Sequence, residues 1–432
     1  MTTTSARALR GGRSIPSIGG WDSTLALRAD PYRFIARRCA ELDTDVFRTR
    51  LLLQPALCLS GEAAAALFYD PARFRREGAA PEALRATLLG TGTVQSLDGA
   101  AHQDRKALFL ASTAPAAVEA LVARVRSAWE QAVPQWTRAG SFALYQAMQP
   151  ILTRAVLGWA GLPRDEHELP THTRELVAMV DGAAGGPLAH VQARLARRRA
   201  ERRFAAWVED LRAGRVDAGS TQALRQVAEH VDADGAPLPP RVAAAELLNL
   251  LRPTVAVSVW ITFVAHALHA HPRWAVALRA DPQGPQARAF VQEVRRHYPF
   301  FPAVVARVRV PFEWRGLHFP QGMRALLDIH GTNHDPRAWH DAQAFRPERW
   351  IGAPPRGSAF VAQGGGDVAT QHRCPGEDIA LRLMLLAVEM LTSRLRYDVV
   401  RPQDLRLDMR RLPALPREGL RIERVALAGA RH

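Results

Sequence analysis

Residues 363–377, QGGGDVATQHRCPGE, are the stretch from which the fold can be argued. Three glycines in a row are followed by one cysteine, Cys374, then by Pro375, Gly376 and a run with helical periodicity. We expect Cys374 to lie at the N-terminus of that helix, where free backbone N–H groups and the positive end of the helix dipole stabilise a thiolate. A thiolate in such a loop is a ligand for a soft metal or a haem iron. The plainer alternative is a buried cysteine in a turn.

The residues around Cys374 have the room and the charge that a flat ligand requires. Glycine has no side chain, so residues 364–366 and Gly376 would let a planar group approach the backbone closely. His372 and Arg373 stand next to the cysteine and could supply positive charge. These features favour a ligand role for the sulfur over the plain turn.

The composition predicts one large domain. The chain has 432 residues, 47% of them hydrophobic, and no repeat or linker divides it. We therefore expect a single domain over residues 1–432, with residues 1–20 as an extended arm. No apolar segment typical of a secretory signal stands at the N-terminus. The three cysteines cannot all pair and form no CxxC motif, which indicates a cytoplasmic protein with Cys39 and Cys58 as inert core thiols.

The formal charge is +15, and Lys106 is the only lysine. The densest basic run, residues 194–204 (RLARRRAERRF), falls in a helical pattern and is expected to form a solvated helix face. The alternatives are a docking surface for an acidic partner, a membrane or a nucleic acid. No zinc-binding or RNA-binding pattern supports nucleic acid, and the charge could instead favour anionic substrates.

The spacing of apolar residues predicts a mostly α-helical chain with a minor β portion. Most of the segment 61–300 is expected to be helical, most clearly over 116–136, 191–213, 241–270 and 287–297, and a last helix is expected over 377–395. Strands are expected within 45–60, divided at Gln54 and Pro55, and within 308–328, with turns at 315–316 and 321–322.

The longest apolar run, residues 254–270, is about long enough to approach a membrane span. Ser258, Thr262 and His266 interrupt it. We therefore expect a buried core helix and no transmembrane segment.

Two further motifs lie far from Cys374 in the sequence. Residues 293–296, EVRR, form an ExxR pattern whose spacing puts the Glu293 carboxylate and the Arg296 guanidinium on one helix face. Residues 345–350, FRPERW, offer Arg349 as a third charged group. ExxR alone is common on charged helices, but the three motifs in this order support one another.

Together these motifs resemble the cytochrome P-450 superfamily, over residues 20–425. The resemblance implies a single haem-thiolate fold in which the Cys374 thiolate is the fifth ligand of the iron in haem b. His372, Cys374 and Gly376 keep the superfamily spacing, whereas the loop from Gly366 to Cys374 is longer than usual.

The same resemblance assigns supporting residues around the haem. It implies that Glu293, Arg296 and Arg349 form a buried network bracing the thiolate loop. His102 and Lys106, one helical turn apart, match a helix that contacts the haem propionates. Exposure at the surface is the alternative for these two side chains.

Arg252 stands in an otherwise apolar helical run, residues 250–256 (LLRPTVA). No acidic residue lies between Glu246 and Asp281, so the acid–alcohol pair of ordinary monooxygenases in the superfamily is missing. A buried guanidinium costs several kcal/mol unless a counterion neutralises it. Arg252 therefore either pairs with a distant carboxylate of the chain or binds a carboxylate substrate, whose two oxygens match its fork. Pro253 removes an N–H and would loosen the helix here.

The Arg252–Pro253 pair, the QGGG loop and YPF at 298–300 resemble bacterial fatty-acid peroxygenases, as do residues 89–106 and 331–336. This implies hydroxylation of long-chain fatty acids at the α or β carbon with hydrogen peroxide, without an obligatory redox partner. Arg252, with Pro253 beside it, would hold the substrate carboxylate, which would act as general acid–base. Oxidative decarboxylation to terminal alkenes is the alternative outcome.

Leu89 and Gln95 match positions that line the substrate pocket in that branch. Ala256, one helical turn from Arg252, would face the haem, and Phe300 and Phe301 are expected to line the channel for the fatty-acid tail. The Gln95 position is histidine in some members, and glutamine cannot exchange a proton near neutral pH as histidine can. This favours hydroxylation over decarboxylation. The alternatives are an ordinary buried amide for Gln95 and plain core packing for the two phenylalanines.

Two other functions fit the motifs. A reductase-dependent monooxygenase would dock an acidic redox protein on the basic run 194–204. A haem-binding sensor or a fatty-acid carrier would bind ligand without forming product. Comparing turnover on peroxide alone with turnover on dioxygen plus a reductase separates the two enzymes.

Overall fold

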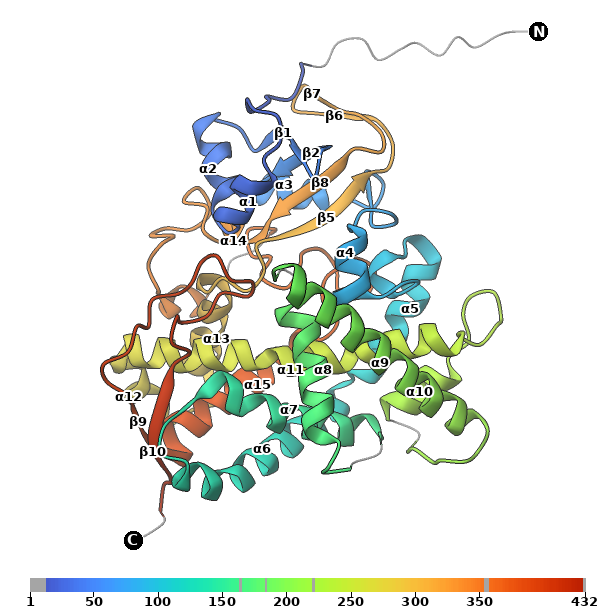
Figure 1. Cartoon of the computed structure of the whole chain (residues 1–432). Helices are drawn as coiled ribbons and strands as arrows, with labels where there is room; N and C mark the ends of the chain where they lie inside the picture. The colour runs from blue at the N-terminus through green and yellow to red at the C-terminus, as the bar shows by residue number, and fades with distance from the viewer. Residues whose placement is uncertain (1–12, 163–164, 183–184, 220–221, 353–356, 430–432) are drawn as a thin grey trace, which may run out of the picture.

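The structure is a computed structural model that describes residues 13–162, 165–182, 185–219, 222–352 and 357–429. Figure 1 shows a β-sheet region at the top of the view and a larger helical region below it. One long helix, α11 (Pro240–Ala270), crosses the helical region from side to side. The predicted fold class, mostly helical with a minor β portion, is confirmed.

The largest sheet joins segments from both ends of the chain. Its strand order is β1 (Val46–Leu51), β2 (Gln54–Leu59), β8 (Arg324–Asp328), β5 (Ala303–Val308) and β3 (Phe74–Arg75). β2 and β8 run parallel, and the other neighbours run antiparallel. The short helices α1 (Thr24–Ala29), α2 (Phe34–Glu41) and α3 (Glu62–Phe68) lie around this sheet in Figure 1.

The first hairpin turns two residues earlier than predicted. Leu52 and Leu53, both with positive φ, form the turn, whereas Gln54 and Pro55 belong to β2. Proline is compatible with extended backbone, so Pro55 does not interrupt the strand. Cys39 and Cys58 are buried in the packing of α2 against the sheet, and burial raises the pKa of both thiols, as expected of inert core cysteines.

The second β segment begins earlier than predicted, because β5 starts at Ala303. The expected turns are correct: β6 (Phe312–Trp314) and β7 (Leu317–Phe319) form a two-stranded sheet around residues 315–316, and residues 321–322 precede β8. Of the predicted arm, residues 13–20 are non-helical and carry bridge pairs at Arg13 and Ser17. Residues 1–12 lie outside the described residues.

The helical region contains the predicted helices. Its helices are α4 (Glu82–Leu84), α5 (Gly99–Ser112), α6 (Pro115–Arg138), α7 (Leu144–Ala160), α8 (Leu169–Asp181), α9 (Pro187–Arg212), α10 (Ala223–Glu229), α12 (Pro272–Ala280), α13 (Pro285–His297), α14 (Ile329–Asn333) and α15 (Glu377–Glu389). The last helix ends before Leu395, because residues 390–394 form a π-helical turn and Leu395 starts β9 (Leu395–Val399). β9 pairs with β10 (Arg421–Leu427), which also pairs with β4 (Phe142–Ala143).

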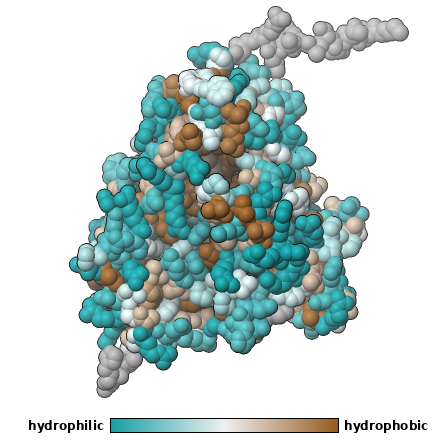
Figure 2. Space-filling view, in the orientation of Figure 1, coloured by the Kyte–Doolittle hydropathy of each residue, from teal (hydrophilic) through white to brown (hydrophobic). Residues whose placement is uncertain are grey.

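α11 is the core of the helical region, packed against α7, α9 and α15. In the described part of the chain it is the one helix that by itself is long and apolar enough to span a membrane, and 94% of its most apolar window is buried in the protein. The prediction of a buried core helix is therefore confirmed. The face in Figure 2 is mostly hydrophilic, with hydrophobic residues gathered in its upper middle.

Candidate active site

The cysteine loop is held from α5 and from the sheet region. The Lys106 ammonium donates hydrogen bonds to the main-chain carbonyls of Gln371, at 2.9 Å, and of Arg373. On the other side, the Gln371 side-chain amide donates to the Tyr69 carbonyl at 2.8 Å. Cys374 follows directly, one residue after the second carbonyl that Lys106 holds. The only lysine of the chain is thus a brace of this loop.

Arg295, inside the ExxR motif, is a brace that the sequence analysis missed. It is 1% exposed, its Nε donates to Gln363 Oε1 at 3.0 Å, and its guanidinium pairs with Glu377. Gln363 and Glu377 are the two ends of the cysteine loop, so one side chain from α13 ties both ends. Glu377 also accepts from Arg373 at 2.7 Å. The available signal was the position of Arg295 between two motif residues.

The Cys374 thiol is in a mixed electrostatic environment. The Cys374 pKa is raised overall, contrary to the expected stabilisation of a thiolate, because burial and the charge of Glu377 outweigh the backbone N–H of Gly376 and the charges of Lys106 and Arg295. His372 does not contribute the expected positive charge, because burial is the largest cause of a pKa lowered to about 4, and the imidazole is neutral at pH 7. Lys106 and Arg295 take that place.

His102 and Lys106 are both 2% exposed, so the surface alternative for these two side chains is wrong. The His102 ring lies against the His372 ring, with centroids 3.9 Å apart. The Nε2 of His102 is buried and has no hydrogen-bond partner among the described residues. Burial, first of all, lowers the His102 pKa to about 3. A neutral ring with an unused nitrogen therefore faces the region beside the cysteine loop.

Glu293, Arg296 and Arg349 lie together. The Glu293 carboxylate pairs with Arg296 at 2.8 and 2.9 Å and with Arg349 at 3.3 Å, and both members of the first pair are fully buried. It also accepts from the Arg346 backbone N–H and the Trp350 indole, at 2.8 and 2.9 Å. The network joins α13 to the segment 346–350, and its three charged members are those that the resemblance implied.

Arg252 is buried, 6% exposed, on α11. Among the described residues, its Nη1 has no hydrogen-bond partner and its guanidinium pairs with no carboxylate. Burial and the charge of Arg197 lower the Arg252 pKa to about 9, so the guanidinium is still charged at pH 7. Within the described residues, the alternative of a structural salt bridge is therefore wrong.

α11 continues through Pro253 without interruption. Pro253 is exposed, whereas every residue over 243–252 and 254–265 is buried. This exposure shows that the helix borders a space at this one place. Thr254 Oγ1 donates to the Leu250 carbonyl at 2.9 Å, and Ala256 is 8% exposed one turn from Arg252.

The acidic residue of α11 nearest to Arg252 is already engaged. Glu246 is fully buried and accepts from the Arg105 guanidinium at 2.8 Å and from the Asn249 amide at 3.2 Å. It therefore cannot replace the missing acid of the monooxygenase pair. Asn249 also donates to Gln95 Oε1 at 3.1 Å, which places the Gln95 amide against α11 one turn from Arg252.

The other pocket candidates lie along the same helix. The Leu89 carbonyl accepts from the Asn249 amide at 3.0 Å. Phe300 is 8% exposed and stacks on Trp260 of α11, with ring centroids 4.5 Å apart. Phe301 is 39% exposed and makes an edge contact with Phe300. The structure thus brings both Leu89 and Phe300 to α11, whereas Phe301 is exposed, which rules out plain core packing for it.

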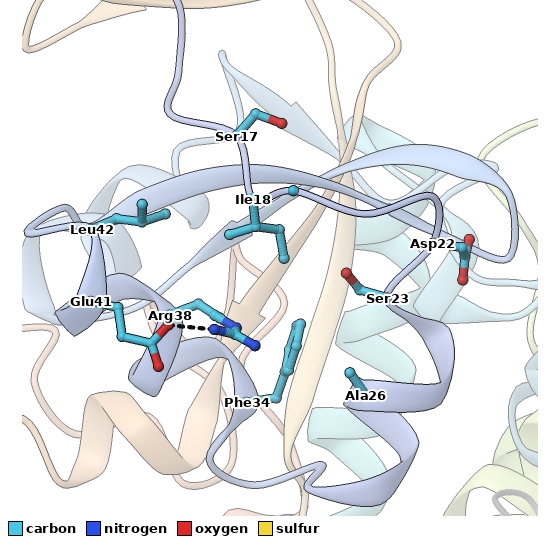
Figure 3. Close-up of a pocket in the computed structure, with 10 residues that line it drawn as sticks. Ser17, Ile18, Asp22, Ser23, Ala26, Phe34, Arg38, Glu41 and Leu42 are labelled. Atoms are coloured by element: carbon cyan, nitrogen blue, oxygen red, sulfur yellow. Dashed lines mark hydrogen bonds and ion pairs between the residues drawn. The ribbon is translucent and has the colours of Figure 1, made fainter.

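A separate cavity of about 390 Å³ lies in the sheet region (Figure 3). It is formed by the arm, α1 and α2, with Ile18, Phe34 and Leu42 as apolar walls and the Arg38–Glu41 ion pair at its rim. None of its lining residues belongs to the cysteine loop, α5 or α11. It is therefore not part of the candidate site.

The residues of the candidate site fit a haem group. Cys374 is a free cysteine and offers a single soft donor directly before α15. The unpartnered Nε2 of His102, whose ring lies against His372 two residues before Cys374, offers a polar contact for a flat ligand. Among the described residues, Cys374 belongs to no group of three or more His, Cys, Asp or Glu ligand atoms, so a closed zinc site is not indicated.

Comparisons with known proteins agree with this geometry. The family model for "Cytochrome P450" matches residues 282–420. Cytochrome P450 1A2 of Oryctolagus cuniculus is 30% identical over 125 residues, and Cytochrome P450 4A22 of Homo sapiens is 24% identical over 181 residues. These matches span 27% and 38% of this chain but only 23% and 34% of the two proteins, less than two thirds of their length.

Solved structures match nearly the whole chain. Cytochrome P450SP alpha (CYP152B1) in complex with (R)-ibuprophen is 47% identical, with a TM-score of 0.92, and the match covers 95% of this chain and 100% of that chain. Cytochrome P450EX alpha (CYP152N1) with myristic acid is 36% identical, with a TM-score of 0.93 over 96% and 100%. Cytochrome P450 OleT in complex with arachidonic acid is 29% identical, with a TM-score of 0.91 over 97% and 100%.

The fold and the cysteine loop, together with the buried Arg252 on α11, define a haem-thiolate oxidoreductase. The chain belongs to the cytochrome P450 superfamily and, within it, to the CYP152 family of fatty-acid peroxygenases.

Proposed function

We propose that this enzyme uses hydrogen peroxide to hydroxylate long-chain fatty acids at the α or β carbon. The observation that carries the proposal is Arg252, a buried charge that has no partner among the described residues. A fatty-acid carboxylate would neutralise this charge and accept two parallel hydrogen bonds from it. The fatty acids bound in P450EX alpha and OleT support this substrate class.

The cofactor of the proposal is haem b, with Cys374 as its axial thiolate ligand. When bound, the haem supplies the oxidising chemistry, because thiolate ligation favours O–O cleavage. His102 is the better placed of the two candidates for a propionate, since its Nε2 is unpartnered whereas Lys106 already holds the loop. Lys106, Arg295 and the Glu293 network would keep Cys374 in place.

The substrate carboxylate would also act as the general acid–base. α11 offers no free acid for this task, because Glu246 is bound by Arg105 and Asn249. A carboxylate that Arg252 holds can accept one proton of the peroxide and return it to the departing oxygen. Its position would bring Cα and Cβ nearest to the reaction, with Pro253 opening the space and Phe300 lining the tail side.

Hydroxylation is proposed as the main outcome, and decarboxylation to terminal alkenes as the minor one. Gln95 lies against α11 through Asn249, and an amide cannot donate or accept a proton as a histidine can. Product analysis after incubation with peroxide and a saturated fatty acid tests this. Terminal alkenes as the main product would contradict it.

Replacing Arg252 is the central test. We expect Arg252→Leu to lower peroxide-driven kcat/KM for a fatty acid at least about a hundredfold, ~2.7 kcal/mol, with haem still bound. The control is Arg198→Leu on α9, an exposed arginine outside the site. Activity retained in Arg252→Leu would show that the guanidinium does not anchor the substrate.

The reductase-dependent alternative is disfavoured by the basic run of α9. Arg194, Arg199 and Arg203 pair with acidic side chains of the chain itself, and Arg197 is buried. Of the six arginines of the run, Arg198 and Arg202 are exposed and make no ion pair with the described residues, so only these two are left free for an acidic redox partner. Turnover on peroxide alone should exceed turnover on dioxygen with a reductase. A cytoplasmic location completes the proposal, since the three cysteines are free thiols.

A further inference from the structure

One main-chain oxygen beside the proposed pocket is held by two helices. The Leu89 carbonyl accepts from the Asn249 amide of α11 at 3.0 Å and from the Arg197 guanidinium of α9 at 3.2 Å. Thr93 adds a third donor, also at 3.2 Å. Leu89 ends the short π-helical turn η1 (Arg85–Leu89), whose last carbonyls lack regular helical partners. The side chains of Asn249, Arg197 and Thr93 supply partners for the Leu89 carbonyl.

Arg197 is built into this position. It lies in the basic run expected to be solvated, but it is only 2% exposed. Its Nη1 donates to the Leu88 carbonyl at 2.9 Å, and Glu201 neutralises it through Nε at 2.6 Å. Gly90 has a φ of +93°, and a Cβ there would lie 2.3 Å from Arg197 Nη2. The guanidinium and the chain around Gly90 therefore fit closely.

Asn249 fixes a second pocket residue at the same time. Its Nδ2 faces two groups that can only accept, the Leu89 carbonyl and the Glu246 carboxylate, so the orientation of its amide is determined. The Gln95 side chain must then direct its Oε1 toward Asn249, at 3.1 Å, so that its NH₂ group points away from Asn249. Asn249 is one helical turn from Arg252, the proposed carboxylate anchor.

We propose that Arg197 and Asn249 are positioning residues that set which substrate carbon is oxidised. The inference rests on the proposed function and deepens it. Arg252 fixes the carboxylate end of the fatty acid. The hydrogen bonds from Arg197 and Asn249 to the Leu89 carbonyl, here called the Leu89 clamp, hold the Leu89 side of the pocket at a constant distance from Arg252. Small displacements of a bound reactant have large effects on rate, so a looser wall changes the ratio of α to β product.

The test compares Arg197→Met with Arg197→Lys and with the matched control Arg198→Met, whose side chain is exposed on the same helix. Arg197→Met removes the donors and keeps the length, whereas lysine can reach one carbonyl but not both. The first readout is the ratio of α- to β-hydroxylated product from a saturated fatty acid with peroxide. The second is hydrogen exchange of the backbone amides over residues 85–95 in the haem-loaded protein.

We expect Arg197→Met to change the product ratio severalfold and to speed exchange about tenfold, as the loss of a charged hydrogen bond would. Arg197→Lys should lie between it and the wild type, and Arg198→Met should match the wild type. An unchanged ratio in Arg197→Met overturns the proposal, even where exchange is faster, because the clamp would then be structural only. Should Arg197→Met not fold, the ratio in Arg197→Lys decides. If the wild-type protein forms no hydroxylated product with peroxide and the fatty acid, that result contradicts the proposed function and not the positioning role of Arg197.

Discussion

Among single residues, Glu293 is the one whose loss we expect to cost the most stability. Its carboxylate is fully buried and pairs with Arg296 and Arg349. Removing its charge leaves the buried Arg296 guanidinium without a counterion, which costs about 3–5 kcal/mol. Glu293→Gln should lower the free energy of unfolding by that amount, measured by urea denaturation of the haem-loaded protein.

Glu348→Gln is the matched control for this prediction. Glu348 pairs with Arg273 at 2.9 Å, but the two side chains are 46% and 68% exposed. Exposed pairs contribute about 0–1 kcal/mol, so the change should stay within that range. Equal losses in the two variants would mean that the Glu293 network does not stabilise the fold.

The residues that sequence reasoning found are those whose chemistry is visible locally. Cys374 stands in a contiguous motif, and Arg252 is conspicuous in an apolar helix. Arg197 had no such signal, because it is one of several similar arginines and its burial depends on carbonyls more than 100 residues away, at Leu88 and Leu89. Asn249 was missed for the same reason, since its partners come together only in the fold.

At the scale of elements, the cysteine loop depends on close packing against Tyr69. A Cβ at Gly365 would lie 2.8 Å from two ring carbons of Tyr69, which is 7% exposed. Overpacking of this kind costs about 1–3 kcal/mol. Gly365→Ala should lower the free energy of unfolding by that amount and reduce the fraction of thiolate-ligated haem, measured from the ferrous–CO spectrum. Gly19→Ala, whose Cβ meets nothing within 4 Å, should leave both values unchanged.

Helices were easier to predict than strands for a physical reason. The 3.6-residue period in α6, α9 and α13 follows from the one face that each helix buries. β5 was predicted too late because its first three residues are only half-buried and show no alternation. The end of α15 was missed because the apolar pattern continues into the π-helical turn, where only the backbone hydrogen bonding changes.

For the molecule as a whole, buried histidines determine the response to acid. Burial, with the charge of Arg296 next, lowers the pKa of His297 and of His334 to about 3. Their rings lie 5.6 Å apart, beside the Glu293–Arg296 pair. Asp328 acts in the opposite direction, since burial raises its pKa to about 7. Burial is also the largest cause of a lowered pKa in His102, His172 and His266. It leaves the pKa raised in Asp328 and Glu246 alone among the acidic side chains described, so the histidines outweigh them.

The ordinary pKa of histidine is 6.5, and the pKa of His297 and of His334 in the folded protein is about 3. Between these two pH values the unfolded chain binds a proton at each histidine, whereas the folded protein does not. The contribution of these two histidines to the free energy of unfolding is therefore complete above pH 6.5. It falls as the pH decreases, by about 1.4 kcal/mol per pH unit for each proton. Urea denaturation at several pH values over this window measures the slope.

His297→Phe keeps a ring next to Tyr298 and Phe345 and should flatten the slope by about one proton. The exposed His340→Gln should leave the slope as it is. A stability that is constant or rises toward acid pH would contradict the idea that these buried rings stay neutral in the native protein.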